Sequence, residues 1–249
     1  MKTLRKLLTL VAVPLVLWSC AGSCGQVRVN LPRDSYALIY NNVTVGVCSE
    51  NECIPRRMAM TGSGAVVASG SGLSIILTAG HVCIPHEDNF VSELGVVTYN
   101  SQSYPARILQ VVPEDDVCVL YIPVELPSVT FSSSPPEIGD VVHSLSSPLG
   151  MKDHRMVPQF RGNYVGKSRK VMARGAGGTA VVFTELDSYT IPTTAGSSGG
   201  PIFNQRGEMV GMSIMARVGF ENFALSSRYE TLKVLVRASK EAVARASIK

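Results

Sequence analysis

The 249-residue sequence has little histidine, little net charge and no long apolar run. A catalytic base must come from four histidines, and three of these lack the strand-to-turn context that such a base usually has: His86, His143 and His154. The formal net charge of +4 includes three cations at the start of the chain, so the remainder is nearly neutral. Charge therefore gives no reason to expect a nucleic-acid partner.

The longest apolar run, Leu7–Trp18, follows a positively charged start and is too short for a comfortable membrane span. This arrangement predicts a signal peptide over residues 1–19. The run ends in Leu17-Trp18-Ser19-Cys20, which is similar to the lipobox of bacterial lipoproteins. We expect an exported protein that is anchored to a membrane by lipid on Cys20; plain secretion, with cleavage after Ser19 or Ala21, is the alternative.

The remaining chain is long enough for a sizeable core, and we expect a tether over residues 20–35 and one domain over 36–249. Short apolar runs alternate with turn residues, first from Ala37 to Ile122 and again from Val141 to Leu225. This spacing predicts strands in two halves, 36–126 and 137–227, separated by a segment rich in proline and serine. A basic stretch, Lys167–Arg174, reads as a solvated, mobile loop rather than a binding patch.

A helix is expected at the end of the chain, over residues 228–247. Ser227 and Glu230 have the spacing of a capping box. An apolar stripe follows on one helical face, which we expect to pack on the second half: Leu232, Val236, Ser239 and Val243.

Three segments carry the candidate chemistry. His81 ends an apolar strand, Asp116 precedes the apolar run Val117–Leu120, and Ser198 lies among glycines that let the backbone turn sharply. A serine hydroxyl becomes a nucleophile when a base lies beside it and an acid orients that base. Asp115 is the rival acid, but it would face the opposite side of the strand. The sequence thus predicts a triad of His81, Asp116 and Ser198.

The serine segment also fits two other patterns. Gly196–Gly200 has the composition of a flexible glycine-serine turn. It also satisfies G-x-S-x-G, the nucleophile elbow of α/β-hydrolases, whose acid and histidine follow the serine in the chain. Neither histidine nor aspartate occurs after Ser198, which excludes the α/β-hydrolase interpretation.

The order and flanks of these motifs resemble trypsin-like serine proteases, and especially their HtrA-like bacterial branch, from about Thr61 to Val236. Four further segments carry the resemblance: Gly62–Val67, Ile138–Val142, Ser147–Gly150 and Phe220–Ser226. The resemblance implies an all-β fold of two six-stranded antiparallel β-barrels of the chymotrypsin type with a C-terminal α-helix. It further implies an oxyanion hole formed by the N–H groups of Gly196 and Ser198, a protein or peptide substrate, and no metal or cofactor. No PDZ-like domain is expected after the protease-like segments, which departs from the larger HtrA proteins.

The resemblance also implies a specificity pocket lined by Pro192, Thr193, Ile214, Met215 and Ala216. None of these is a carboxylate, which argues against a preference for lysine or arginine. The segment Thr193–Gly196 looks like glutamyl endopeptidases, but those have a histidine where this chain has Ser213. We expect a small or medium apolar substrate side chain.

Two cysteine pairs are candidates for disulfides in an oxidising compartment. Cys48 and Cys53 flank a polar, turn-like stretch, and a bond between them would close a hairpin. Cys83 and Cys118 each lie two residues beyond a triad candidate, so a disulfide and two buried free thiols are both consistent with the sequence.

A function of another class stays open, namely a catalytically silent member of the same fold that binds peptides or serves as a surface or virion structural protein. The intact residues His81, Asp116 and Ser198 favour the serine endopeptidase.

Overall fold

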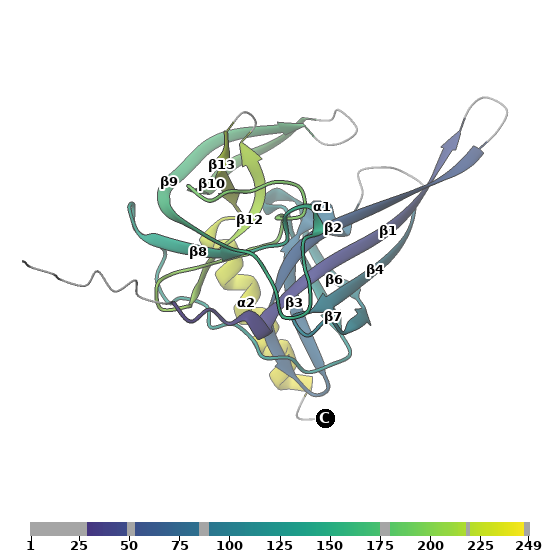
Figure 1. Cartoon of the computed structure of the whole chain (residues 1–249), viewed down its shortest axis with the longest axis horizontal. Helices are drawn as coiled ribbons and strands as arrows, with labels where there is room; N and C mark the ends of the chain where they lie inside the picture. Colours follow the sequence, from purple (N-terminus) through teal and green to yellow (C-terminus); the bar gives the residue numbers. More distant parts are fainter. Residues whose placement is uncertain (1–28, 49–52, 85–89, 175–179, 218–219, 247–249) are drawn as a thin grey trace, which may run out of the picture.

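The structure is a computed structural model, and it describes residues 29–48, 53–84, 90–174, 180–217 and 220–246. Its strands form two antiparallel β units, and a long C-terminal helix, α2 (Tyr229–Ala246), lies against them (Figure 1). This confirms the all-β prediction with a terminal helix. No helix among the described residues is long and apolar enough to cross a membrane.

The first unit is a seven-stranded sheet in the order β5-β4-β1-β2-β3-β7-β6. Its strands are β1 (Tyr36–Cys48), β2 (Cys53–Gly70), β3 (Leu73–Ala79), β4 (Phe90–Thr98), β5 (Ser103–Pro105), β6 (Arg107–Val112) and β7 (Val117–Ile122). The count exceeds the expected six because the three-residue strand β5 pairs with the edge of β4.

The second unit is a closed six-stranded barrel in the order β10-β13-β12-β11-β8-β9, as expected. Its strands are β8 (Val141–Leu145), β9 (Gln159–Arg174), β10 (Ala180–Tyr189), β11 (Pro201–Phe203), β12 (Met209–Arg217) and β13 (Phe220–Ser226). Each neighbouring pair in this barrel is antiparallel.

Two long hairpins, β1–β2 and β9–β10, extend outward from the body of the molecule (Figure 1). The second corrects an expectation, because the basic stretch Lys167–Arg174 is part of strand β9 and not a loop. Side chains alternate along it: Lys167 is exposed and lies 3.5 Å from Glu185 of β10, whereas the Ser168 hydroxyl bonds to that of Ser188. The period of two leaves Lys167 and Arg169 exposed on the same face of the strand.

A single apolar cluster joins the two β units to α2. It contains Ile76 and Leu120 from the first sheet, Phe203 and Met209 from the second barrel, and Leu232 from α2. A smaller cluster fills the second barrel. Because this core is shared, burial of apolar side chains holds the two β units together where they meet.

The packing of α2 departs from the sequence in two ways. Its buried face matches the predicted stripe, but it lies mainly on β2 of the first unit and less on β12 of the second. The Ser227 hydroxyl has no hydrogen-bond partner among the described residues, so the expected capping box is wrong. Instead Asp187 of β10 accepts the Tyr229 backbone N–H at 2.9 Å. A carboxylate is favoured there because the helix N-terminus is positively polarised.

The segment before β1 packs on the domain from its first described residues onward. Leu31 is buried, and residues Arg33–Ser35 form a 3-10 turn (η1). The Arg33 guanidinium donates to the Val157 carbonyl at 3.1 Å. The part of the expected tether that the structure describes is therefore attached to the folded domain.

Candidate active site

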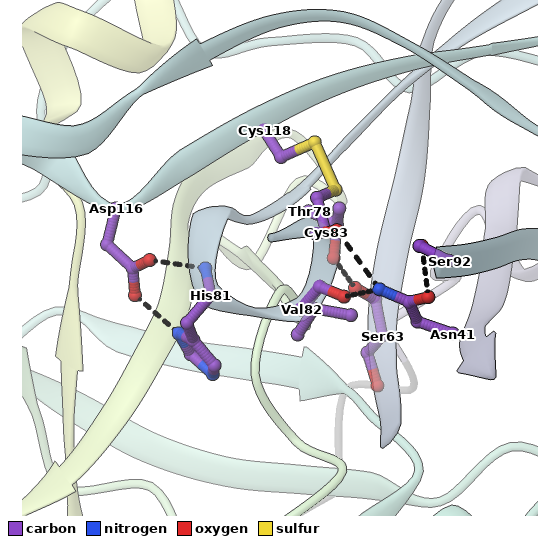
Figure 2. The surroundings of a disulfide bond; sticks show 9 residues. All are labelled: Asn41, Ser63, Thr78, His81, Val82, Cys83, Ser92, Asp116 and Cys118. Carbon is purple, nitrogen blue, oxygen red and sulfur yellow. Dashed lines mark hydrogen bonds and ion pairs between the residues drawn. A yellow bond between two sulfur atoms is a disulfide. The ribbon is translucent and has the colours of Figure 1, made fainter. Parts of the chain in front are cut away.

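His81 lies in a single helical turn, α1 (Gly80–Cys83), directly after strand β3. The turn is held by Asn41 of β1, whose side-chain amide donates to the carbonyls of Val82 and Cys83 at 3.1 and 3.0 Å (Figure 2). Asn41 is fully buried and its own oxygen accepts the Ser92 hydroxyl. The carbonyls at the end of this short turn are thus satisfied by a side chain rather than by water.

Asp116 and His81 face each other across the ends of β7 and β3. Asp116 Oδ2 lies 2.7 Å from His81 Nδ1, and Oδ1 accepts the His81 backbone N–H at 2.8 Å (Figure 2). A carboxylate can only accept, so Nδ1 carries the proton and Nε2 is left as the basic nitrogen. The His81 side chain keeps 32% exposure while that of Asp116 keeps 12%, so the imidazole remains reachable.

Asp115 faces the opposite direction, toward α2. Its carboxylate, 3% exposed, accepts two hydrogen bonds from the Arg228 guanidinium at 2.6 and 2.7 Å and one from the Thr231 hydroxyl at 2.7 Å. The two aspartates diverge because Asp115 ends a 3-10 turn, η2 (Pro113–Asp115), and Asp116 takes a left-handed conformation with φ 50°. The expected reason, alternation along a strand, does not apply, since β7 begins at Val117.

A disulfide joins Cys83 of α1 to Cys118 of β7, beside the His81–Asp116 pair (Figure 2). Both cysteines are fully buried. The backbone pairs Cys48 with Cys53 at the end of the β1–β2 register, but the side chains of that candidate pair lie outside the described residues. The lipidation candidate Cys20 also lies outside them.

Ser198 lies in the connection between β10 and β11. Backbone hydrogen bonds fix the carbonyl groups of Ala195 and Ser197 in this connection. The Ala195 carbonyl accepts the Leu149 N–H at 2.6 Å, and the Ser197 carbonyl accepts the Gly200 N–H at 2.9 Å. In a trans peptide the N–H points away from the carbonyl of the same group. The N–H groups of Gly196 and Ser198 therefore point away from these partners, and neither donates to another group in the described part of the chain.

Glycine is required at both ends of this serine segment. Gly196 and Gly199 have φ values of +88° and +85°, and residues other than glycine rarely adopt this backbone conformation. A Cβ on Gly196 would also clash with the Ser147 carbonyl, and one on Gly199 with the Ser63 carbonyl. The glycines thus combine a tight turn with close backbone packing, and the flexible-turn interpretation does not describe this segment.

The serine segment packs against the end of β3, directly before the turn that carries His81. A Cβ at Gly199 would lie 3.0 Å from the Ala79 nitrogen. The Ser198 hydroxyl itself donates to the Ile214 carbonyl of β12 at 3.2 Å, and not to the His81 imidazole. Catalytic hydrogen bonds are often long or misaligned in structures without substrate, and a hydroxyl rotates freely.

The expected pocket residues come from the connection before Ser198 and from strand β12. The Thr193 hydroxyl lies 3.4 Å from that of Ser213, and both residues are buried. Ile214 is buried, whereas Pro192, Met215 and Ala216 are partly exposed. Both hydroxyls are neutral, so this buried pair contributes no charge.

Sequence reasoning missed the polar residues that support these elements: Tyr36, Asn41, Ser63 and Ser147. Ser63 stands in Gly62-Ser63-Gly64, where the flanking glycines signalled a close approach of backbone. For the other three, no local pattern in the chain marks a buried hydrogen-bonding residue.

A family model described as "Trypsin-like peptidase domain" matches residues 62–212, and the chain belongs to this family. Serine protease Do-like HtrA of Bacillus subtilis is 30% identical over 159 residues, which are 62% of this chain and 33% of that protein. A probable periplasmic serine endoprotease, DegP-like, of Chlamydia trachomatis is 27% identical over 164 residues, 64% of this chain and 29% of that protein. The resemblance to the HtrA-like branch is confirmed, and the chain spans about a third of the length of these relatives.

Solved structures show the same fold. The active form of the Rv3671c protease from M. tuberculosis superposes with a TM-score of 0.63 at 15% identity, covering 84% of each chain. The HtrA-type protease AlgW with decapeptide gives a TM-score of 0.66 at 19% identity, covering 81% of this chain and 62% of that one. At these identities the match establishes the architecture alone.

Proposed function

We propose that this protein is a serine endopeptidase that cleaves peptide bonds through an acyl-enzyme on Ser198. One observation carries the proposal: Asp116 is hydrogen-bonded to His81 Nδ1, and the serine segment packs against the end of β3, directly before the turn that carries His81. Membership of the trypsin-like peptidase family supports it.

The chemistry follows from the geometry. The Ser198 hydroxyl rotates away from Ile214 and attacks the peptide carbonyl while His81 Nε2 takes its proton. Asp116 holds the imidazole tautomer and stabilises the imidazolium that forms. The N–H groups of Gly196 and Ser198 receive the oxyanion, and donors of this kind are worth about 3–4 kcal/mol each in such reactions.

The remaining steps return the enzyme to its starting state. The imidazolium of His81 gives its proton to the leaving amine as the carbon–nitrogen bond breaks. A water molecule then loses a proton to His81 and attacks the acyl-enzyme. His81 returns that proton to Ser198 as the carbon–oxygen bond breaks, which releases the new carboxylic acid and restores the Ser198 hydroxyl. Every proton is carried by His81, so the steps require no metal or cofactor.

The preferred substrate has a small or medium apolar side chain at the cleaved bond. Pro192, Thr193, Ile214, Met215 and Ala216 would line its pocket, and the neutral hydroxyls of Thr193 and Ser213 lie together at 3.4 Å. A charged substrate side chain would lose its hydration without gaining an opposite charge from these residues.

The protein is exported and attached to a membrane by lipid on Cys20. Residues 1–19 act as the signal and residues from Cys20 onward as the mature chain. The charged start, the short apolar run and the lipobox-like ending support this location. Relatives named as periplasmic endoproteases are consistent with export.

A catalytically silent, peptide-binding protein is the second candidate. The hydrogen bond from Ser198 to Ile214, in place of one to His81, is the observation that favours it. In that case the serine would serve packing and not chemistry.

A fluorophosphonate probe separates the two candidates, because it reacts covalently only with an activated serine. The parent protein should label and cleave an unfolded protein substrate, whereas Ser198→Ala should do neither and keep its thermal stability. Ser197→Ala is the matched control and should retain most activity. Absence of labelling in a folded parent protein would favour the silent protein, and equal labelling of Ser198→Ala would remove Ser198 from its role.

A further inference from the structure

Ser63 of β2 is fully buried and directs both its backbone and its side chain at the serine segment of the other β unit. Its N–H donates to the Ser198 carbonyl at 2.7 Å, and its hydroxyl donates to the Gly196 carbonyl at 2.9 Å. Its own carbonyl accepts the Thr78 hydroxyl at 2.7 Å (Figure 2). A residue of the first sheet thus holds the backbone on both sides of Ser197.

The Gly196 carbonyl belongs to the peptide group between the two proposed oxyanion donors. The other end of that group, the Ser197 N–H, donates to the Thr194 carbonyl at 2.9 Å. Because a peptide group is planar, fixing its carbonyl and its N–H fixes its orientation. The relative direction of the Gly196 and Ser198 N–H groups then depends on the bond from Ser63.

The Ser63 hydroxyl is saturated. It donates its proton to the Gly196 carbonyl. Its two lone pairs accept the Ser147 N–H at 3.0 Å and the Tyr36 hydroxyl at 3.0 Å. With the Ser63 proton committed, Tyr36 must donate to Ser63, and Ser147 must donate its own hydroxyl proton to Tyr36 across 2.6 Å. The hydrogen bonds therefore run in one direction, from Ser147 through Tyr36 and Ser63 to Gly196.

This chain of hydroxyls is buried and stays protonated. Tyr36, Ser63 and Ser147 are each at most 1% exposed. Burial raises the pKa of Tyr36 to about 12, so the phenol keeps its proton at neutral pH. Hydrogen bonds in a buried, low-dielectric interior strengthen one another, and losing one member leaves its neighbours unpaired.

We propose that Ser63 is a positioning residue for the oxyanion hole, with Tyr36 and Ser147 as its support. The inference rests on the proposed function, since it assigns a role within that same site. The serine segment packs closely on these residues, because a Cβ on Gly196 would clash with the Ser147 carbonyl and one on Gly199 with the Ser63 carbonyl. Without the Ser63 hydroxyl, the middle peptide group can tilt and carry the Gly196 N–H away from the oxyanion.

Ser63→Ala tests this directly, because alanine keeps the backbone bond to Ser198 and removes only the hydroxyl. We expect kcat on a peptide substrate to fall by about 10- to 100-fold, less than the loss of a whole donor, with KM unchanged. The inhibition constant of a peptide boronic acid, whose adduct places an oxygen in the hole, should rise by a similar factor. The pH dependence set by His81 should not move.

Ser69→Ala is the matched control on the same strand. Ser69 also hydrogen-bonds through its hydroxyl, to Ser74 at 3.0 Å, but it lies beyond the serine segment. Its loss should lower stability and leave kcat and boronic acid inhibition unchanged. Tyr36→Phe removes the donor to Ser63 and should lower kcat less than Ser63→Ala, and the two effects should not add in the double variant.

The outcomes separate the two proposals. A folded, active Ser63→Ala with parental kcat and inhibition overturns the role of Ser63 and leaves the endopeptidase intact. A parent protein that does not react with the fluorophosphonate overturns the endopeptidase and this role with it. If Ser63→Ala does not fold, Tyr36→Phe decides, and parental kcat in that variant overturns the proposal.

Discussion

At the residue scale, two adjacent aspartates differ in their tasks because of one backbone angle. The left-handed conformation of Asp116 turns its carboxylate to His81, while Asp115 remains in the preceding turn and pairs with Arg228. Aspartate is among the few residues that adopt this conformation readily, since its short polar side chain can bond locally. The local turn thus directs the two carboxylates to different partners, Asp116 to His81 and Asp115 to Arg228.

We predict that Asp116→Asn lowers kcat by about 10⁴-fold, because the amide no longer selects the imidazole tautomer that leaves Nε2 basic. Asp115→Asn should lower kcat far less. It should instead reduce the free energy of unfolding by about 1–2 kcal/mol, because the partly exposed Arg228 loses a charged partner. Steady-state kinetics and urea unfolding measure the two effects. If the kinetic losses were reversed, the acid that orients His81 would be Asp115.

At the element scale, the start of α2 depends on a carboxylate from another strand. Asp187 accepts the Tyr229 N–H and the Tyr164 hydroxyl, both at 2.9 Å. Burial raises the pKa of Asp187 above its usual value, and the two hydrogen bonds offset only part of this. The folded state therefore holds the Asp187 proton more tightly than the unfolded state does.

This pKa shift predicts a pH dependence of stability. A carboxyl group whose pKa is raised by folding contributes most when protonated, and the contribution is lost as pH rises from its unfolded value, about 3.9, through its folded value. Compared with Asp187→Asn, which cannot ionise, the parent should be relatively most stable at the acid end and lose this advantage toward neutrality. Urea unfolding of both proteins across this range measures the difference. An advantage of the parent that grew with pH would contradict the shift.

The disulfide acts on the same scale. Cys83 and Cys118 are separated by 35 residues and join the elements that carry His81 and Asp116. In the chain-entropy model a loop of this length contributes about 4 kcal/mol by restricting the unfolded chain. The same bond holds α1 next to β7. One disulfide therefore supports both the stability of the fold and the contact between His81 and Asp116.

At the scale of the whole molecule, the proposed lipid would act independently of the folded domain. We predict that the parent partitions into a detergent phase and carries a diacylglyceryl mass on Cys20. Cys20→Ser should partition into water and still react with the fluorophosphonate, because Cys20 precedes the folded domain. A mature chain that begins at Ala21 or later without lipid would show plain secretion.

Much of the architecture could be predicted from the sequence because its signals are local. Alternating apolar residues and turns mark strands wherever they occur, and the stripe from Leu232 to Val243 marks the buried face of α2. The segments containing His81, Asp116 and Ser198 were recognisable because a strand end and a glycine turn are short patterns. The number of strands in the first sheet and the length of the β9–β10 hairpin were less predictable, since pairing partners extend strands beyond their apolar centres.

Only the tertiary structure decided which polar groups meet. Asp187 and not Ser227 caps α2, and Ser63 reaches Gly196 across 133 positions of sequence. Such contacts leave no periodic trace, because a buried serine or tyrosine satisfies its hydrogen bonds with whatever the fold brings beside it. The chain thus determines its strands and marks its candidate catalytic residues by pattern. Their final orientation depends on buried hydrogen bonds between the two β units.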